Sequence, residues 1–121
     1  MEIERVLEAL QSVRCPAVCE ESDLHALIET ALTERGIPVR HEVRLAPRCR
    51  IDFMAEDIGI EVKKSRPSPS ALRAQLARYA ESEAVTALVA VVSRGVALPK
   101  TIGGKPVYQV PLERLWGIFL P

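Results

Sequence analysis

The sequence predicts a single α/β domain in which helices pack against a mixed central β-sheet of about five strands. Its length of 121 residues suits one domain. Hydrophobic residues make up 48% of the chain and charged residues 26%, as in a globular protein with an apolar core. The periodicity of the apolar residues predicts two helices, three strands, a helix and two strands, in that order.

Two amphipathic helices are expected before the first strand. Apolar side chains recur three or four residues apart over residues 2–14, and Pro16 is expected to end this helix. The second helix is predicted over residues 22–35, with Ser22 as the N-cap and Gly36 just beyond its last turn.

Three strands are expected next, joined as a meander of antiparallel pairs. Apolar and charged residues alternate roughly over residues 39–45, which indicates a half-buried strand. Residues 50–54 and 58–62 form the second and third strands, with a short polar turn at residues 56–57 between them.

A third helix follows the meander and determines the direction of the next strand. Ser68 is expected to cap it and Pro69 to occupy its first position, while its apolar stripe extends to Tyr79. A helical crossover of this length makes the following strand, residues 85–92, parallel to a strand already in the sheet.

The last elements are short. The continuous apolar run over residues 85–92 predicts a strand that is covered on both faces. A short strand is expected over residues 107–110, and residues 112–120 are interpreted as a helical or irregular tail that packs Trp116 in the core.

No secretory leader or membrane span is expected, because acids occupy the start of the chain and the longest apolar run, Ala84–Val92, is about half a bilayer span. The expected location is therefore cytoplasmic.

Three cysteines are an odd number for a disulfide framework. We interpret them as small buried residues in a reducing compartment. The alternative is a zinc site that combines them with His25 or His41; the cysteines are Cys15, Cys19 and Cys49.

The charges are unevenly distributed although they sum to zero. Residues 1–34 contain eight acids and two bases, whereas residues 63–80 contain five bases and no acid. Such a distribution can present one basic face to a nucleic acid, and an ordinary solvated helix face is the alternative. The candidate phosphate-contacting residues are Lys64, Arg66, Arg73 and Arg78.

The predicted hairpin brings together three side chains that carry chemistry. Glu61 and Lys63 are two apart on one strand and therefore share a face. A two-residue turn at 56–57 would place Asp52 opposite Glu61, and a four-residue turn at 56–59 would place it opposite Lys63. Either turn leaves all three on one face, whereas a three-residue loop would scatter them.

Two opposed carboxylates repel each other, and a divalent cation relieves the repulsion. Mg²⁺ prefers one or two carboxylates together with waters and phosphate oxygens. Such an ion activates water and stabilises charge on a phosphate, and Lys63 beside it can orient the attacking water. The set therefore suits phosphodiester hydrolysis, and a cross-strand ion pair on a solvated sheet face is the structural alternative.

The acid, the hairpin and the Glu-x-Lys that ends a strand resemble motifs II and III of the PD-(D/E)xK nuclease superfamily. The resemblance covers roughly residues 20–92 and is closest in kind to Holliday-junction-resolvase-type and other small members. It implies a restriction-endonuclease-like fold and DNA cleavage that depends on Mg²⁺ or Mn²⁺. Ile51 stands where the superfamily pattern has its proline.

The resemblance also implies roles for individual residues. Asp52 and Glu61 would bind the metal, and Lys63 would assist the attacking water. The helix before the meander often carries an acid that assists the metal, for which Glu21 is the preferred candidate over its neighbour Glu20. The helix after the Glu-x-Lys strand often carries a glutamine or a base near the site, and Gln75 fits that place.

The sequence thus predicts a metal-dependent DNA nuclease in residues 1–121. One alternative is a catalytically inactive nucleic-acid-binding module of the same fold. Another is a protein-interaction subunit whose acid-rich first helices form the contact surface. A domain this small can hardly enclose a duplex alone, so a homodimer is a further hypothesis.

Overall fold

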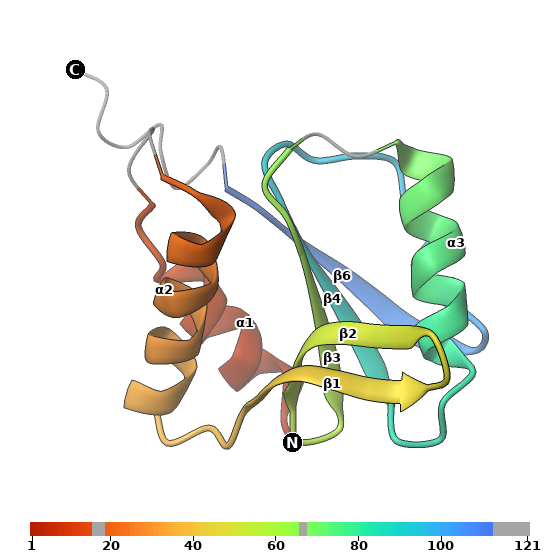
Figure 1. Cartoon of the computed structure of the whole chain (residues 1–121), viewed down its shortest axis with the longest axis horizontal. Coiled ribbons are helices and arrows are strands. Elements are labelled where there is room, and N and C mark those ends of the chain that lie inside the picture. The colour runs from red at the N-terminus through yellow and green to blue at the C-terminus, as the bar shows by residue number, and fades with distance from the viewer. Residues whose placement is uncertain (16–18, 66–67, 113–121) are drawn as a thin grey trace.

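The computed structural model describes residues 1–15, 19–65 and 68–112. Within these ranges the chain folds into three helices and a six-stranded mixed sheet, arranged as three layers (Figure 1). The helices are α1 (Ile3–Gln11), α2 (Glu21–Glu34) and α3 (Pro69–Ala80). The strands are β1 (Arg40–Ala46), β2 (Cys49–Ala55), β3 (Ile58–Lys63), β4 (Ala87–Val92), β5 (Thr101–Ile102) and β6 (Lys105–Pro111).

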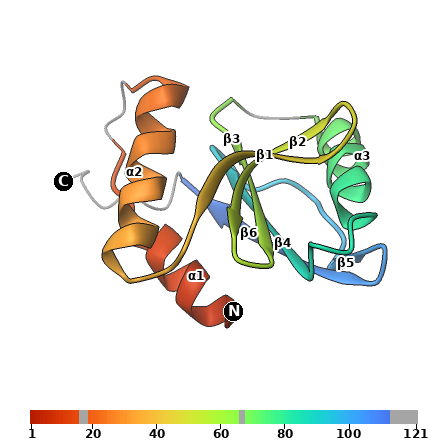
Figure 2. The same cartoon turned by 60° about the horizontal axis from the view of Figure 1, so that its bottom comes forward.

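The sheet has the order β1-β2-β3-β4-β6-β5. The first three strands pair antiparallel, which confirms the predicted meander. Helix α3 is the crossover, and β4 runs parallel to β3 as predicted. Strand β6 is parallel to β4, and β5 pairs antiparallel with β6 near one end of α3 (Figure 2). The sheet therefore has one strand more than the five expected. The additional strand is β5, whose two residues are too few to show a pattern in the sequence.

Helices cover both faces of the sheet and create two apolar clusters. Side chains from alternate positions of β3 and β4, such as Ile60 and Val89, pack against α1 and α2. The intervening positions, such as Leu88 and Ala90, pack beneath α3. Every residue of β4 is buried, which confirms the interpretation of its continuous apolar run.

The first two helices differ slightly from their predicted bounds. Helix α1 ends at Gln11, three residues before the predicted end. Helix α2 begins at Glu21 with Glu20 as its N-cap, so the assignment of Ser22 as the cap is wrong. The reason is that the Asp23 carboxylate accepts the Glu20 backbone N–H at 3.1 Å, which starts the helix two residues earlier than a cap at Ser22 would. Gly36 follows the helix with φ of 72°, as predicted.

The cysteines are buried, as expected, but they are not all reduced. Cys15 and Cys19 form a disulfide, and Cys49 is a buried free thiol. Because two of its three sulfurs are paired, the zinc set considered above keeps only the Cys49 thiol and is not formed. The predicted tail begins at residue 112, and its remaining residues 113–120, with Trp116, lie outside the described residues, as does the helix stop at Pro16. In the part of the chain that is described, no helix has the length and apolar character to cross a membrane.

Candidate active site

The β2–β3 hairpin has the two-residue turn on which the predicted site depends. Ala55 pairs with Ile58, and Phe53 pairs with Ile60, so residues 56–57 form the turn. Glu56 adopts a left-handed φ of 56°, which suits a tight hairpin connection. Continuing the same register places Asp52 opposite Glu61, as the two-residue alternative predicted.

Strands β2 and β3 diverge just beyond the last regular pair, and the two acids lie where they part. The Asp52 Oδ2 atom accepts the Val62 backbone N–H at 2.8 Å. In the other direction, Glu61 Oε1 lies 3.4 Å from the Asp52 backbone nitrogen. Each carboxylate therefore faces the backbone N–H of the opposite strand, in place of the carbonyl oxygen of a regular ladder.

Gly59 on β3 allows a side chain of β2 to pack closely over it at this point. A Cβ atom on Gly59 would lie 2.6 Å from Ile51 Cδ1 and 3.1 Å from Leu88 Cδ2. The side chain of Ile51 therefore occupies the space above a residue that has no side chain. This close approach fixes the position of β2 immediately before Asp52.

Glu61 is the buried acid of the site, with only 3% of its surface exposed. Its Oε2 atom lies 3.2 Å from the Lys63 ammonium, and its Oε1 atom accepts the Tyr79 O–H at 2.9 Å. Burial, and then the nearby Asp52 carboxylate, raise the pKa of Glu61 to about 7, against the opposing effect of Lys63. The predicted set of Asp52, Glu61 and Lys63 thus converges at one point.

Helix α3 connects to Glu61 through Tyr79. Besides Glu61, the Tyr79 hydroxyl lies 2.9 Å from Gln75 Nε2 and 3.0 Å from the Arg50 carbonyl oxygen. Burial and the Glu61 charge raise the pKa of Tyr79 well above its usual range, so the hydroxyl remains a donor. Gln75 donates to this hydroxyl, so it is one link away from the buried acid.

A cleft of about 340 Å³ opens beside this point, between the starts of α2 and α3. Its lining includes Glu21, Lys63, Lys64 and Gln75, four residues that the sequence had indicated. Glu21 also lines a second cavity of about 380 Å³ between α2 and β1. The helix acid therefore lies at the boundary between the two hollows, four residues before His25 on the same helix.

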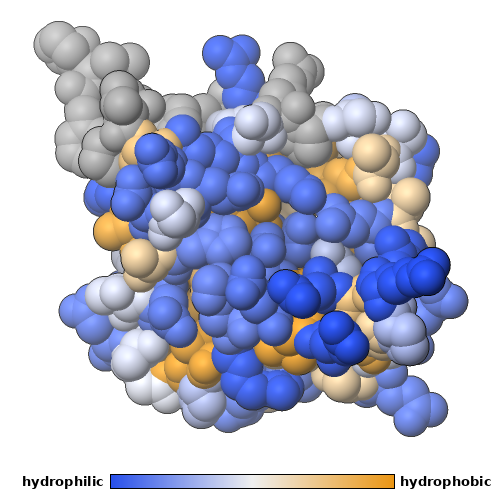
Figure 3. Space-filling model, viewed as in Figure 1, coloured by the Kyte–Doolittle hydropathy of each residue, from blue (hydrophilic) through white to orange (hydrophobic). Residues whose placement is uncertain are grey.

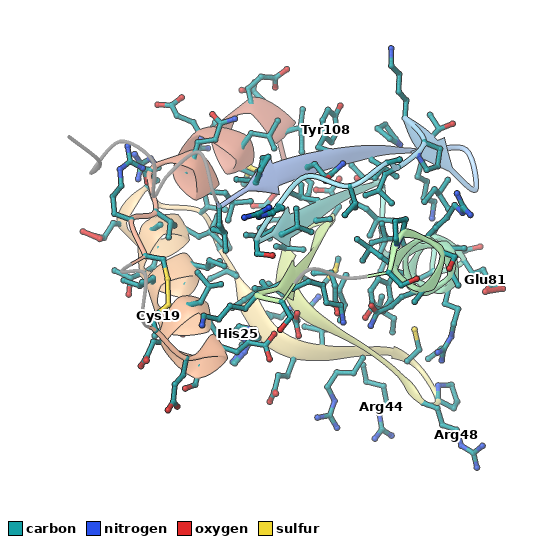
Figure 4. The ribbon with its side chains drawn as sticks, turned by 90° about the horizontal axis from the view of Figure 1, so that it is seen from above. Cys19, His25, Arg44, Arg48, Glu81 and Tyr108 are labelled. Carbon is teal, nitrogen blue, oxygen red and sulfur yellow. A yellow bond between two sulfur atoms is a disulfide. The ribbon has the colours of Figure 1, made fainter. Side chains whose placement is uncertain are left out.

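His25 and His41, considered above only as possible zinc ligands, contact each other beside Asp52. His25 Nδ1 lies 2.9 Å from His41 Nε2. His25 Nε2 lies 3.9 Å from Asp52 Oδ2; it is a buried atom without a hydrogen-bond partner. The His41 ring stacks on Phe53 with centroids 4.6 Å apart. Figure 4 shows His25 between α2 and the β1–β2 hairpin. His25 follows Glu21 by four residues, so the two share a face of α2, and this spacing was the feature of the sequence that could have placed His25 near the site.

The predicted basic residues are only partly gathered at the site. Lys64 lines the cleft, and Arg73 is exposed on α3. Arg78 donates to the Arg48 carbonyl oxygen at 2.7 Å and so ties α3 to the β1–β2 turn. Arg66 lies outside the described residues.

Comparison with protein families, curated proteins and solved structures found no match.

The donor chemistry of the site fits a divalent cation. Across the described ranges, no three His, Cys, Asp or Glu side chains are already arranged as a metal site. The Asp52 carboxylate nevertheless raises the pKa of the nearby Glu61, and a cation between the two acids would relieve this repulsion. When the proton of the His25 ring is on Nδ1, the Nε2 atom has a free lone pair that faces the Asp52 carboxylate. These three side chains would hold the ion.

Proposed function

We propose that the chain is a Mg²⁺- or Mn²⁺-dependent nuclease with a restriction-endonuclease-like fold that hydrolyses DNA phosphodiester bonds. The convergence of Asp52, Glu61 and Lys63 at the diverging end of the β2–β3 hairpin carries the proposal. The order of elements from α2 to β4, with these residues on β2 and β3, supports the assignment of the fold.

Asp52 and Glu61 would hold the metal, with His25 as a nitrogen ligand and Glu21 reaching the site from the edge of the cleft. A bound Mg²⁺ or Mn²⁺ supplies an activated water and stabilises the negative charge that develops on the phosphate. Nitrogen ligands suit Mn²⁺ better than Mg²⁺, which prefers an all-oxygen environment. We therefore expect Mn²⁺ to support at least as much activity as Mg²⁺.

Lys63 would act on the substrate. Its ammonium lies 3.2 Å from Glu61 Oε2, and the side chain is 33% exposed along the cleft. From there it can donate to a non-bridging phosphate oxygen or orient the attacking water. The buried Glu61 accepts the Tyr79 O–H, which fixes the direction of its carboxylate while Lys63 contacts substrate.

The test is cleavage of a fluorescently labelled DNA duplex in Mg²⁺, in Mn²⁺ and in EDTA. Asp52→Asn and Lys63→Ala should each lower the rate by roughly 100-fold or more, because each removes a group that acts at the reacting phosphate. Glu83→Gln and Lys100→Ala are matched controls, because both residues are exposed and neither lines the cleft. Circular dichroism would establish that all four variants fold.

Cleavage that survives both site variants, or that proceeds equally in EDTA, would refute the proposal. Salt-sensitive DNA binding by the parent protein without any cleavage would instead favour the non-catalytic binding module.

A further inference from the structure

The β1–β2 hairpin carries a group of arginines without acidic partners, which we call the arginine face: Arg44, Arg48 and Arg50. All three side chains are exposed, and within the described residues none lies within 4 Å of a carboxylate. Residues 40–50 contain these three bases, Arg40 and one acid, Glu42, so the hairpin has a net charge of 4 − 1 = +3. Figure 3 shows strongly hydrophilic side chains gathered over this part of the molecule.

The strand register directs Arg44 and Arg50 outward, and Arg48 lies in the turn between the two strands. Val43 and Ile51 are cross-strand partners, and both pack into the apolar cluster beneath α3. Their neighbours Arg44 and Arg50 therefore lie on the opposite face, where they are also direct partners. Figure 4 shows Arg44 projecting from the hairpin into solvent. Like charges opposite each other destabilise a strand pair, so this arrangement suits an external polyanion.

The arginine face is fixed relative to the candidate active site. Arg50 precedes Asp52 by two residues on β2, a distance of about 7 Å along a strand. The Arg50 carbonyl oxygen accepts the Tyr79 O–H at 3.0 Å, and the Arg48 carbonyl oxygen accepts from Arg78 at 2.7 Å. A nucleic acid that contacts these arginines would thus lie one or two nucleotides from the acids.

The surrounding surface favours one kind of nucleic acid. Residues 1–34, which include α1 and α2, carry eight acids and two bases, so that layer repels phosphates. In the described part of the chain, Phe53 and Tyr79 are buried, and Tyr108 lies on β6, two strands away from the hairpin's partner β3. Single strands are usually held by exposed aromatic side chains that stack on bases. Arginines without such a platform suit the backbone of a duplex.

We propose that the arginine face binds the sugar–phosphate backbone of double-stranded DNA beside the cleavage point, without reading its sequence. This inference rests on the proposed nuclease function. The substrate would then approach the site over the β1–β2 hairpin, and the acid-rich surfaces of α1 and α2 would not contact it.

The test is fluorescence anisotropy with a labelled DNA duplex in EDTA, over a series of salt concentrations. Each lost phosphate contact lowers the slope of log K against log salt by about 0.9, so Arg44→Ala combined with Arg50→Ala should lower it by about 1.8. If the parent and this variant converge near 1 M salt, binding at 0.1 M is weakened roughly 60-fold. The control pairs Arg5→Ala with Arg35→Ala, which removes the same charge from α1 and from the C-cap of α2.

Three results would overturn the inference: no salt-sensitive duplex binding by the parent, equal weakening by both double variants, or tighter binding of a single strand of the same length. The nuclease proposal is judged separately, by divalent-dependent cleavage. Arginine-dependent duplex binding without cleavage would refute the nuclease alone, and cleavage that is unaffected by the arginine variants would refute this inference alone.

Discussion

Replacing Glu61 with glutamine should change how stability depends on pH. Glu61 has a pKa of about 7 in the folded protein, against an ordinary value of 4.5, because it is buried and lies close to Asp52. The folded state therefore holds the proton more tightly than the unfolded state does. The resulting stabilisation is fully present below pH 4.5 and is lost as pH rises to 7. Glutamine keeps an oxygen that accepts the Tyr79 O–H but does not titrate.

The magnitude follows from the difference between the two pKa values. The change of the Glu61 pKa from 4.5 to about 7, at about 1.36 kcal/mol per pKa unit, gives about 3 kcal/mol between pH 4 and pH 8. The parent should lose this much more stability than Glu61→Gln over that interval. Titrating groups that lie far from Glu61 occur in both proteins and cancel in the difference.

The assay is urea unfolding followed by far-ultraviolet circular dichroism, with both proteins measured at several pH values. Mg²⁺ or Mn²⁺ should raise the stability of the parent at pH 8 and have much less effect on Glu61→Gln, because a neutral amide is a weaker metal ligand. A difference between the two proteins that stays constant from pH 4 to pH 8 would refute the argument that burial and Asp52 hold the Glu61 proton.

Two further predictions concern the groups around the acids. Tyr79→Phe should lower kcat/KM by roughly 10- to 100-fold and raise the apparent pKa of Glu61, because the Glu61 carboxylate loses a hydrogen-bond donor. A lower kcat/KM with an unchanged pH profile would contradict an orienting role for Tyr79. Gly59→Ala should destabilise the fold by about 1–3 kcal/mol through contact with Ile51 Cδ1. Adding Ile51→Val removes that atom and should recover part of the loss in urea unfolding, and no recovery would contradict the packing argument.

Much of the architecture was predictable because it depends on local patterns. Helical and strand periodicities gave the three helices and five of the strands, and the polar pair at residues 56–57 predicted the turn. That turn determines the pairing of Asp52 with Glu61, so the centre of the candidate site followed from residues within a short segment. The specific restriction-endonuclease-like fold remains a proposal.

What the sequence did not indicate depends on contacts between distant segments or on very short elements. His25 meets His41 and Asp52 only after α2 has packed against the sheet. The role of Tyr79 was interpreted as core packing, since a buried hydroxyl cannot be distinguished from an apolar stripe by spacing alone. Strand β5 has two residues, too few for an alternation to be visible.

The bond between Asp52 and the Val62 amide means that this acid also supports the backbone. An alanine at position 52 would abolish any chemistry there and would also leave a peptide group without its acceptor, at a cost of about 1–3 kcal/mol. Inactivation and weakened folding would then be confounded in one variant. Asparagine keeps an oxygen for that peptide group while losing the charge, so it is the substitution from which an inactive yet intact protein should be prepared.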